Sequence, residues 1–402
     1  MTEMRIITRT IFILSLISLF ADIASEMVYP IIPLYLNEIG FKVFWIGLLE
    51  GFAGFTAGIS KGYFGKLSDE KGLRLPFVKI GYFLSAVSKP LLVLLKIKLW
   101  VFFSRALDRL GKGVRTAARD ALLSQQTNKE NKAKVFGFHR AMDTTGAAIG
   151  PIIALIFLLI YPGHYKNLFL IAFIPGVISV LLIFLLKERK QISSTLKKGN
   201  FFSYFRYWTV TDSEYKKLVL GLLLFALFNS SDIFLLLKTK QAIGEQSLNI
   251  LSISFTSETI TIAAYIFYNI VFAATAYPLG VLADKLGMRN IFMLGIFLFV
   301  AVYAGFALTA SLPIILVLFF LYGIYAAATE GIAKAWITNI AHDENTATAV
   351  GFYTSCESVC AFFASAIAGA VWGIFGSTAT FLTTSFIALI VLLYFLLKFR
   401  RH

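Results

Sequence analysis

The chain has 402 residues, of which 58% are hydrophobic and 15% are charged. A soluble domain of this composition would expose a large apolar surface, so the composition excludes an ordinary soluble globular protein. The formal net charge is +15, which in a soluble protein would suggest nucleic-acid binding. Here the Lys and Arg residues cluster between apolar runs, as in the loops of a membrane protein, and we expect no nucleic-acid partner.

Apolar stretches of membrane-spanning length recur along the chain. About 20 apolar residues cross the hydrocarbon core as a helix, and backbone groups in lipid must be paired within the segment. The alternation typical of a barrel strand is absent. We therefore predict an all-α membrane protein with twelve transmembrane helices, at residues 8–37, 44–66, 76–95, 99–120, 135–160, 167–187, 216–239, 257–284, 290–309, 312–340, 346–372 and 376–398.

The predicted helices divide into two pseudo-symmetric six-helix bundles. We place an N-terminal half at 1–190, a linker at 191–215 and a C-terminal half at 216–402. The linker region is basic and then aromatic, which predicts a cytoplasmic connection whose aromatic side chains lie at the level of the lipid headgroups.

A repeated segment supports this division. Gly65, Asp69, Gly72 and Arg74 follow the second predicted span, and Gly280, Asp284, Gly287 and Arg289 follow the eighth with the same spacing. Parallel halves with matching segments are a common plan among transporters.

The basic residues also predict an orientation. They gather at both chain ends, at the two repeated turns and in the linker, and all of these lie on one side only if both termini are cytoplasmic. We expect a multi-pass protein of the bacterial inner membrane.

The two G-x-L-x-D-x-x-G-x-R segments resemble the signature loop of the major facilitator superfamily. The resemblance covers the whole chain and implies a secondary transporter. It assigns a gating latch to the two loops, in which an aspartate and an arginine stabilise the outward-facing state. The latch residues implied are Gly65, Asp69, Arg74, Gly280, Asp284 and Arg289.

Further segments resemble narrower groups within that superfamily. Residues 22–30, 108–120 and 229–232 are similar to an orphan bacterial permease subgroup without an assigned substrate. Gly146, Gly150 and Pro151 resemble a motif of the antiporter branches, although small residues at this spacing also serve helix packing alone.

Ionisable residues inside predicted spans are costly and usually face a cavity or a partner. Asp22 and Glu26 lie one helical turn apart and share a face. Such a pair can gain and lose a proton for coupling, bind a cation or a substrate amine, or form a structural ion pair.

The fourth predicted span carries Arg105, Asp108 and Arg109 at depth. Arginine suits bidentate recognition of carboxylate or phosphate, so these residues suggest an anionic or zwitterionic substrate. The alternative is neutralisation by Asp22, Glu26 and Asp143 without substrate contact. Arg119 and Asp120, nearer the cytoplasmic end, suggest gating or pairing between the halves.

Other polar positions complete the set of candidates for proton coupling or substrate binding. Glu330 and Lys334 have the spacing of an ion pair within one helix, either a closed bridge or a switch. Asn229 and Asp232 interrupt an apolar helix, as cavity-lining breaks do. The remaining candidates are Asp143, in the fifth span, and Glu357, its counterpart in the repeat.

No phosphate-binding loop of the G-x-x-x-x-G-K-[ST] type occurs. We therefore expect a monomeric secondary transporter without a cofactor, driven by the proton gradient, which carries a small polar organic solute, anionic or a metal chelate. The alternative is a proton-driven exporter of drugs or metal ions. A polytopic membrane enzyme or receptor fits less well, because no nucleophile–base signature is visible.

Overall fold

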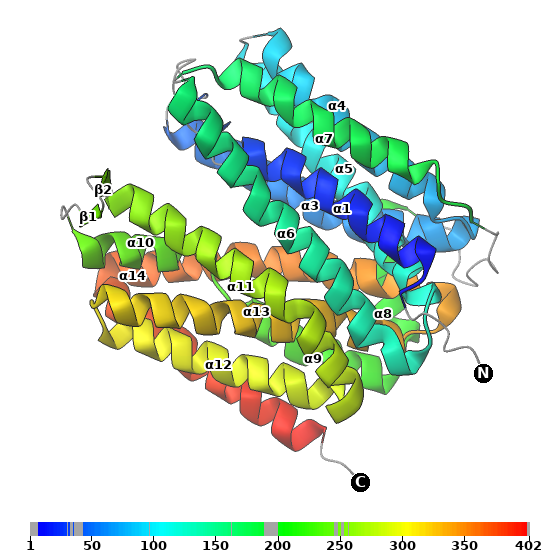
Figure 1. The fold of residues 1–402 in the computed structure, drawn as a ribbon. Coiled ribbons are helices and arrows are strands. Elements are labelled where there is room, and N and C mark those ends of the chain that lie inside the picture. Colours follow the sequence, from blue (N-terminus) through cyan, green and yellow to red (C-terminus); the bar gives the residue numbers. More distant parts are fainter. Residues whose placement is uncertain are drawn as a thin grey trace.

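The computed structural model describes residues 7–29, 31–32, 35, 43–95, 97–161, 163–188, 200–244, 248–250, 253–255 and 257–399. Nearly all of these residues are helical, as predicted. The long helices run side by side in two bundles, drawn in the upper and lower parts of Figure 1.

The N-terminal bundle contains six long helices. The first ends at Val28, and the described residues Ile32 and Tyr35, which are again helical, lie within the predicted span 8–37. The described helices of this bundle are α1 (Arg9–Val28), α3 (Val43–Lys71), α4 (Leu75–Leu94), α5 (Lys98–Gln125), α6 (Lys132–Ile160) and α7 (Tyr165–Ile183).

The C-terminal bundle repeats this arrangement with two irregularities. Its first span is broken between α9 and α10, where residues 227–232 leave the helix at the polar break. Its last element, α14, consists of two helices that meet at a kink at Gly376, whose φ of 84° is not helical. The helices are α9 (Ser213–Ala226), α10 (Ile233–Ile243), α11 (Ser257–Leu286), α12 (Met288–Leu308), α13 (Leu312–Ile340) and α14 (Thr346–Lys398).

With α9 and α10 counted as one span and α14 as two, the described residues form twelve membrane-spanning segments in two six-helix bundles. This confirms the predicted fold. Eight helical stretches among the residues searched are long and apolar enough to cross a membrane by themselves, and the stretch with α14 contains two spans. A small antiparallel hairpin was not predicted. It joins β1 (Leu248–Ile250) to β2 (Ile253–Phe255), with Leu248 opposite Phe255.

Both chain ends lie at the same end of the helices (Figure 1). This end, which we call the terminal face, also carries the α3–α4 turn, the α11–α12 turn, and the starts of α6 and α14. The repeated G-x-L-x-D-x-x-G-x-R segments therefore lie together on one face of the molecule.

The two bundles touch closely near the terminal face through paired glycines. A Cβ atom on Gly65 of α3 would collide with the carbonyl oxygen of Ala347 at the start of α14. In the other half, a Cβ atom on Gly280 of α11 would collide with the carbonyl oxygen of Ala133 at the start of α6. These two contacts are related by the sequence repeat, and both permit close backbone approach between the halves.

The linker contributes to this contact. Its described part forms a 3-10 helix, η2 (Phe201–Arg206), and one turn of α-helix, α8 (Tyr207–Val210). Tyr204 is 1% exposed, packs its ring over Gly62 of α3, and shares a 2.8 Å hydrogen bond with Ser355 of α14. Tyr204 thus packs against α3 and α14, with its ring in the space above a glycine, and the headgroup level of the linker aromatics stays a prediction. Residues 189–199 lie outside the described residues, and the domain boundaries stay a prediction.

Candidate functional site

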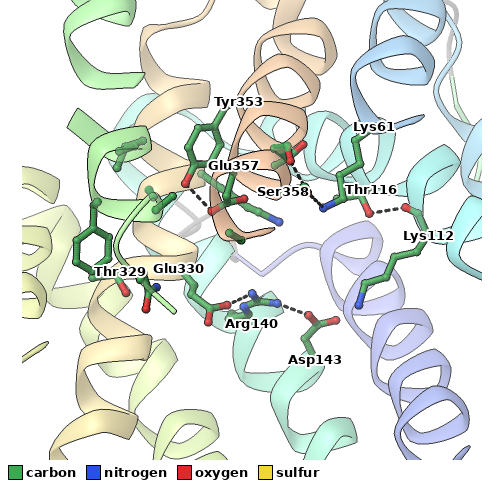
Figure 2. A pocket seen from close by; sticks show the side chains of 18 of the residues that line it. Lys61, Lys112, Thr116, Arg140, Asp143, Thr329, Glu330, Tyr353, Glu357 and Ser358 are labelled. Carbon is green, nitrogen blue, oxygen red and sulfur yellow. Dashed lines mark hydrogen bonds and ion pairs between the residues drawn. The ribbon is translucent and has the colours of Figure 1, made fainter. Parts of the chain in front are cut away.

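A polar cavity of about 410 Å³ lies between the two bundles. Six basic and four acidic side chains line it, so its wall carries an excess of positive charge when all are ionised. Figure 2 shows these side chains converging from both halves. The charged lining residues are Asp22, Lys61, Lys112, Arg115, Arg119, Arg140, Asp143, Glu330, Lys334 and Glu357.

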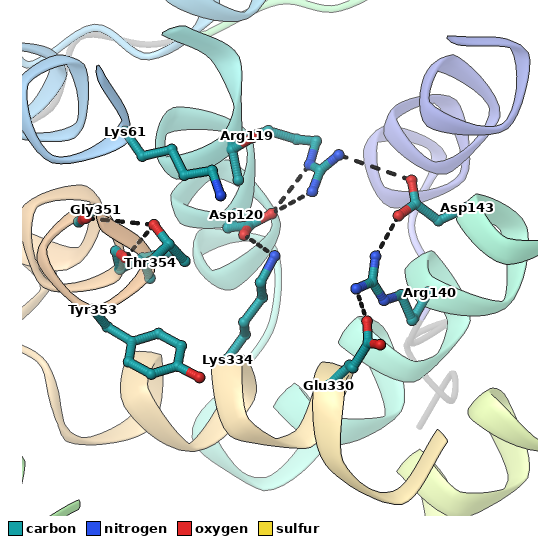
Figure 3. A network of polar contacts seen from close by, with 12 residues as sticks. Lys61, Arg119, Asp120, Arg140, Asp143, Glu330, Lys334, Gly351, Tyr353 and Thr354 are labelled. Atoms are coloured by element: carbon teal, nitrogen blue, oxygen red, sulfur yellow. Dashed lines mark hydrogen bonds and ion pairs between the residues drawn. The ribbon is translucent and has the colours of Figure 1, made fainter. Parts of the chain in front are cut away.

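A chain of ion pairs crosses from one half to the other beside this cavity (Figure 3). In the N-terminal half, Arg119 of α5 contacts Asp120 at 3.0 Å and Asp143 of α6 at 3.9 Å. Arg140 of α6 binds the same Asp143 at 2.6 Å. These contacts link α5 and α6 through alternating charges.

Both ends of this chain reach α13 of the C-terminal half. Lys334 binds Asp120 at 2.8 Å, and Glu330 binds Arg140. Glu330 and Lys334 lie one turn apart on α13. The six residues therefore form a chain of three positive and three negative charges that begins and ends on α13. We call it the cross-half network: Arg119, Asp120, Arg140, Asp143, Glu330 and Lys334.

The network corrects the predicted internal pair on α13. Glu330 and Lys334 do not bind each other within the part of the chain that is described; each binds a partner in the opposite half. The two residues have the i,i+4 spacing, but the ion-pair partners that they bind lie across the interface. Buried charges are stable only with such partners, since removal from water costs several kcal/mol per ion.

The carboxylates of α1 lie next to this network. Asp22 lines the cavity, and its main acidic neighbour is Asp143 of α6. Asp143 also accepts a hydrogen bond from the Ser18 hydroxyl. Glu26, one turn farther along α1, has Lys112 and Arg109 as its main basic neighbours. Two neighbouring carboxyl groups can share one proton through a hydrogen bond, so Asp22 and Asp143 form a candidate proton-binding pair.

Two lysines in the cavity lack an acidic partner within ion-pair distance among the described residues. The Lys61 ammonium group of α3 donates to the neutral Ser358 hydroxyl of α14 at 3.3 Å. Lys112 of α5 lines the same cavity and has Asp22 as its main acidic neighbour, without an ion pair to it. Neither lysine was predicted as a site residue. For Lys61, the signal in the sequence is a lysine within an apolar run, between Gly58 and Gly62.

The arginines proposed from the fourth span lie elsewhere. Asp108 is bound by Lys89 of α4 at 2.7 Å and by Arg105 at 3.5 Å, and these three line a narrow space inside the N-terminal bundle rather than the central cavity. Arg109 lies over the ring of Tyr29, 5.8 Å from its centroid. The structure thus separates this cluster from the cavity. Of the three carboxylates that the sequence suggested for neutralising the arginines, Glu26 lies near Arg109 and Arg105, and Arg105 also pairs with Asp108 of its own helix.

In the C-terminal half, Asn229 and Glu357 reach the cavity. Asn229 donates to the Tyr325 hydroxyl at 2.9 Å, and Glu357 accepts a 2.7 Å hydrogen bond from Tyr353. Asp232 is not among the cavity residues and accepts a 2.7 Å hydrogen bond from Tyr322 inside the C-terminal bundle.

The aspartates of the two repeated turns join the halves at the terminal face. Asp69 binds Arg74 at 2.8 Å and accepts hydrogen bonds from the backbone N–H and hydroxyl of Thr348, at 2.6 and 2.8 Å. These groups belong to the first turn of α14, where unpaired N–H groups favour an anion. The aspartate therefore caps a helix of the opposite half.

The second turn copies this contact only in part. Asp284 accepts hydrogen bonds from the N–H groups of Ala133 and Lys134 in the first turn of α6, at 3.0 and 2.8 Å. Arg289, however, donates to the carbonyl oxygens of Phe395 and Leu396 on α14, at 3.4 and 3.2 Å. The aspartate-to-arginine pairing implied for the latch is present in the N-terminal turn, while the C-terminal arginine binds within its own half.

Comparison with known proteins identifies the family to which the chain belongs. The family model of the Major Facilitator Superfamily matches residues 14–257 and 246–402. An uncharacterized transporter of that type from Methanocaldococcus jannaschii is 32% identical over 391 residues, which cover 96% of this chain and 94% of the relative. A multi-drug resistance efflux pump of Streptococcus pneumoniae is 30% identical over 142 residues, or 35% of each chain.

Solved structures agree on the fold. The E. coli fucose:proton symporter superposes with a TM-score of 0.79 at 12% identity, covering 99% of this chain and 100% of the symporter. A second structure of that protein, in the outward conformation, gives a TM-score of 0.78. The chain therefore belongs to the major facilitator superfamily and is a multi-pass membrane transporter, not an enzyme.

Proposed function

We propose that this transporter carries a small anionic organic solute, or an anionic metal chelate, across the membrane by alternating access coupled to protons. The observation that carries the proposal is the pair Lys61 and Lys112. Both ammonium groups line the central cavity without an ion pair to any described carboxylate, whereas the cross-half network satisfies its own charges. A substrate carboxylate or phosphate would supply the missing partner.

Alternating access is supported by the distribution of contacts between the halves. The Gly65–Ala347 and Gly280–Ala133 contacts and both aspartate caps lie at the terminal face, so the cavity is closed on that side. By the distribution of basic residues, we propose that this face is cytoplasmic and that the arrangement is outward-facing. The inward-facing state then requires the cross-half network to separate.

Proton coupling is supported by the proximity of the carboxyl groups of Asp22 and Asp143, which can share one proton. Asp143 is also bound by Arg140, which in turn binds Glu330 across the interface. Loss or gain of the proton at this pair changes the charge that Arg140 faces, and therefore the strength of the contact between the halves. The proton and the conformational change thus act on one set of side chains.

A second candidate is a proton-driven drug efflux antiporter. It is favoured by the match to the streptococcal multi-drug resistance efflux pump over 142 residues. Export of metal ions has less support, because the described residues contain no group of three or more metal-ligating side chains. In either case we propose a monomer of the bacterial inner membrane, without a cofactor or a nucleic-acid partner, whose partners are the bilayer and its small-molecule substrate.

The test is a thermal-unfolding screen of the detergent-purified protein. The panel contains dicarboxylates, phosphorylated sugars, metal chelates and lipophilic cations, at two pH values. We expect anionic compounds alone to raise the unfolding temperature, and the Lys61→Gln and Lys112→Gln variants to lose that response. Lys129→Gln, an exposed lysine at the terminal face, is the matched control. Stabilisation by lipophilic cations alone would contradict the proposal and favour drug efflux.

A further inference from the structure

The break between α9 and α10 presents a row of unpaired oxygen atoms. The helix ends at Ala226 and the next begins at Ile233. The carbonyl oxygens of residues 226–230 accept no hydrogen bond from any described residue. Carbonyl groups at the end of an interrupted membrane helix carry partial negative charge and, in transporters, coordinate small cations.

The carboxylate of Asp232 lies at the same break and has no cationic partner. It occupies the N-cap position of α10, but its side chain does not cap that helix. The Tyr322 hydroxyl donates to its Oδ1 atom at 2.7 Å, and no ion pair joins it to a described Lys, Arg or His. In contrast, Asp120, Asp143 and Glu330 each bind a basic side chain. A carboxylate inside a membrane bundle without such a partner is costly.

One further side-chain oxygen at the break, Asn229 Oδ1, is buried without a hydrogen-bond partner among the described residues, while the Ser230 and Tyr303 hydroxyls lie next to each other. Ser230 is 5% exposed and Tyr303 is 1% exposed. The Asn229 amide nitrogen is used by Tyr325, which leaves its oxygen available. Unsatisfied buried polar atoms are rare in folded proteins and call for an explanation such as a bound ion.

We propose that this break binds one Na⁺ ion, held by Asp232, the Asn229 and Ser230 side-chain oxygens and the freed backbone carbonyls. The donors are all oxygen atoms, which suit a hard cation. A single carboxylate balances one positive charge. The rings of Tyr268 and Tyr325 each lie 5.1 Å from that of Tyr322, so aromatic side chains pack around the tyrosine that binds the carboxylate.

This site differs from the proposed function in chemistry. It lies at the break in the C-terminal bundle, where Asn229 borders the central cavity, while the proton pair Asp22 and Asp143 and the cavity lysines belong to the N-terminal half. Sodium binding can therefore be measured without knowing the substrate, and a negative result would leave the proposals on anion and proton transport untouched.

The experiment is thermal unfolding of the full-length protein in detergent, titrated with NaCl while choline chloride holds the ionic strength constant. We expect a saturable rise in the unfolding temperature with Na⁺, and no comparable rise with K⁺. Equal responses to Na⁺ and K⁺, or no response to Na⁺, would overturn the proposal.

Two variants locate the ion. Asp232→Asn should abolish the response to Na⁺. Ser230→Ala, a milder change that keeps the carboxylate, should raise the half-saturating Na⁺ concentration by about 10- to 100-fold. Glu130→Gln, an exposed carboxylate at the terminal face, should respond as the unaltered protein does. If Ser230→Ala and every folded Asp232 variant kept the original response, the ion would bind elsewhere and the assignment would be wrong.

Discussion

Lys334 of α13 binds Asp120 of α5 across the interface between the two halves, at 2.8 Å. One turn away, Glu330 binds Arg140 of α6. The same helix therefore presents one charge of each sign to the opposite half, and α5 and α6 return the complementary charges. If the halves separated, Glu330 and Lys334 would lose these partners, so the two bonds tie the conformational state to the charge state of the interface.

Asp69→Asn should weaken closure of the terminal face rather than substrate affinity. The substitution removes the charge that Arg74 binds and that the first turn of α14 favours. We expect greater labelling of a cysteine placed at Ala347, in a background where Cys356 and Cys360 are serine. Glu70→Gln, which removes only a pair within α3, is the control. Unchanged labelling in Asp69→Asn would argue against a latch at this residue.

Gly65→Ala should oppose the same closure by steric means. Its added methyl group meets the Ala347 carbonyl oxygen, a backbone atom that cannot rotate away. We expect more of the protein to be open at the terminal face and transport to be slower, measured in proteoliposomes. Gly373→Ala adds a methyl group in open space on α14 and should leave both properties unchanged. Normal closure in Gly65→Ala would show that the halves tolerate a wider separation there.

Asp22→Asn should uncouple transport from protons. An amide can still hydrogen-bond to Asp143, but it cannot release the proton that the carboxyl pair shares. We expect solute exchange to continue while solute-driven proton movement, followed with a pH-sensitive dye inside proteoliposomes, is lost. Glu26→Gln tests whether the next turn of α1 takes part. Normal proton movement in both variants would exclude the α1 carboxylates as the coupling site.

Lys89→Met should destabilise the fold, because it leaves Asp108 with only the longer contact to Arg105. Removing one partner of a buried ion pair costs about 3–5 kcal/mol, so the unfolding temperature should fall. The double variant Lys89→Met/Asp108→Asn should recover most of the loss, as expected for a structural pair. If the single variant kept its stability but lost substrate binding, Asp108 would belong to a binding site instead.

Much of the fold follows from local sequence properties. Apolar length and the requirement for internal backbone pairing predict the helices, and the repeated loop predicts the two halves. The polar break before α10 and the division of α14 were also visible, as Asn229 to Asp232 and as the interval between the last two spans. These features depend on residues close together in the chain.

The partners of the buried charges could not be predicted in the same way. Lys334 has a favourable partner one turn away in sequence, Glu330, yet each binds the opposite half. Asp108 is paired by Lys89 from the neighbouring helix, and Arg289 binds α14 instead of the nearby Asp284. Pairing across helices depends on helix rotation and depth, which periodicity alone leaves open. For the same reason Lys61 was missed as a cavity residue.

The most direct test of the account is the distance between the two halves at the terminal face, measured by double electron–electron resonance. Spin labels at Lys71 of α3 and Lys285 of α11, both exposed, report on it in a variant whose native cysteines are serine. Short distances should dominate in the unaltered network, and Lys334→Met together with Arg140→Gln should shift the distribution to long distances. An identical distribution in the two proteins would contradict a network that holds the halves together.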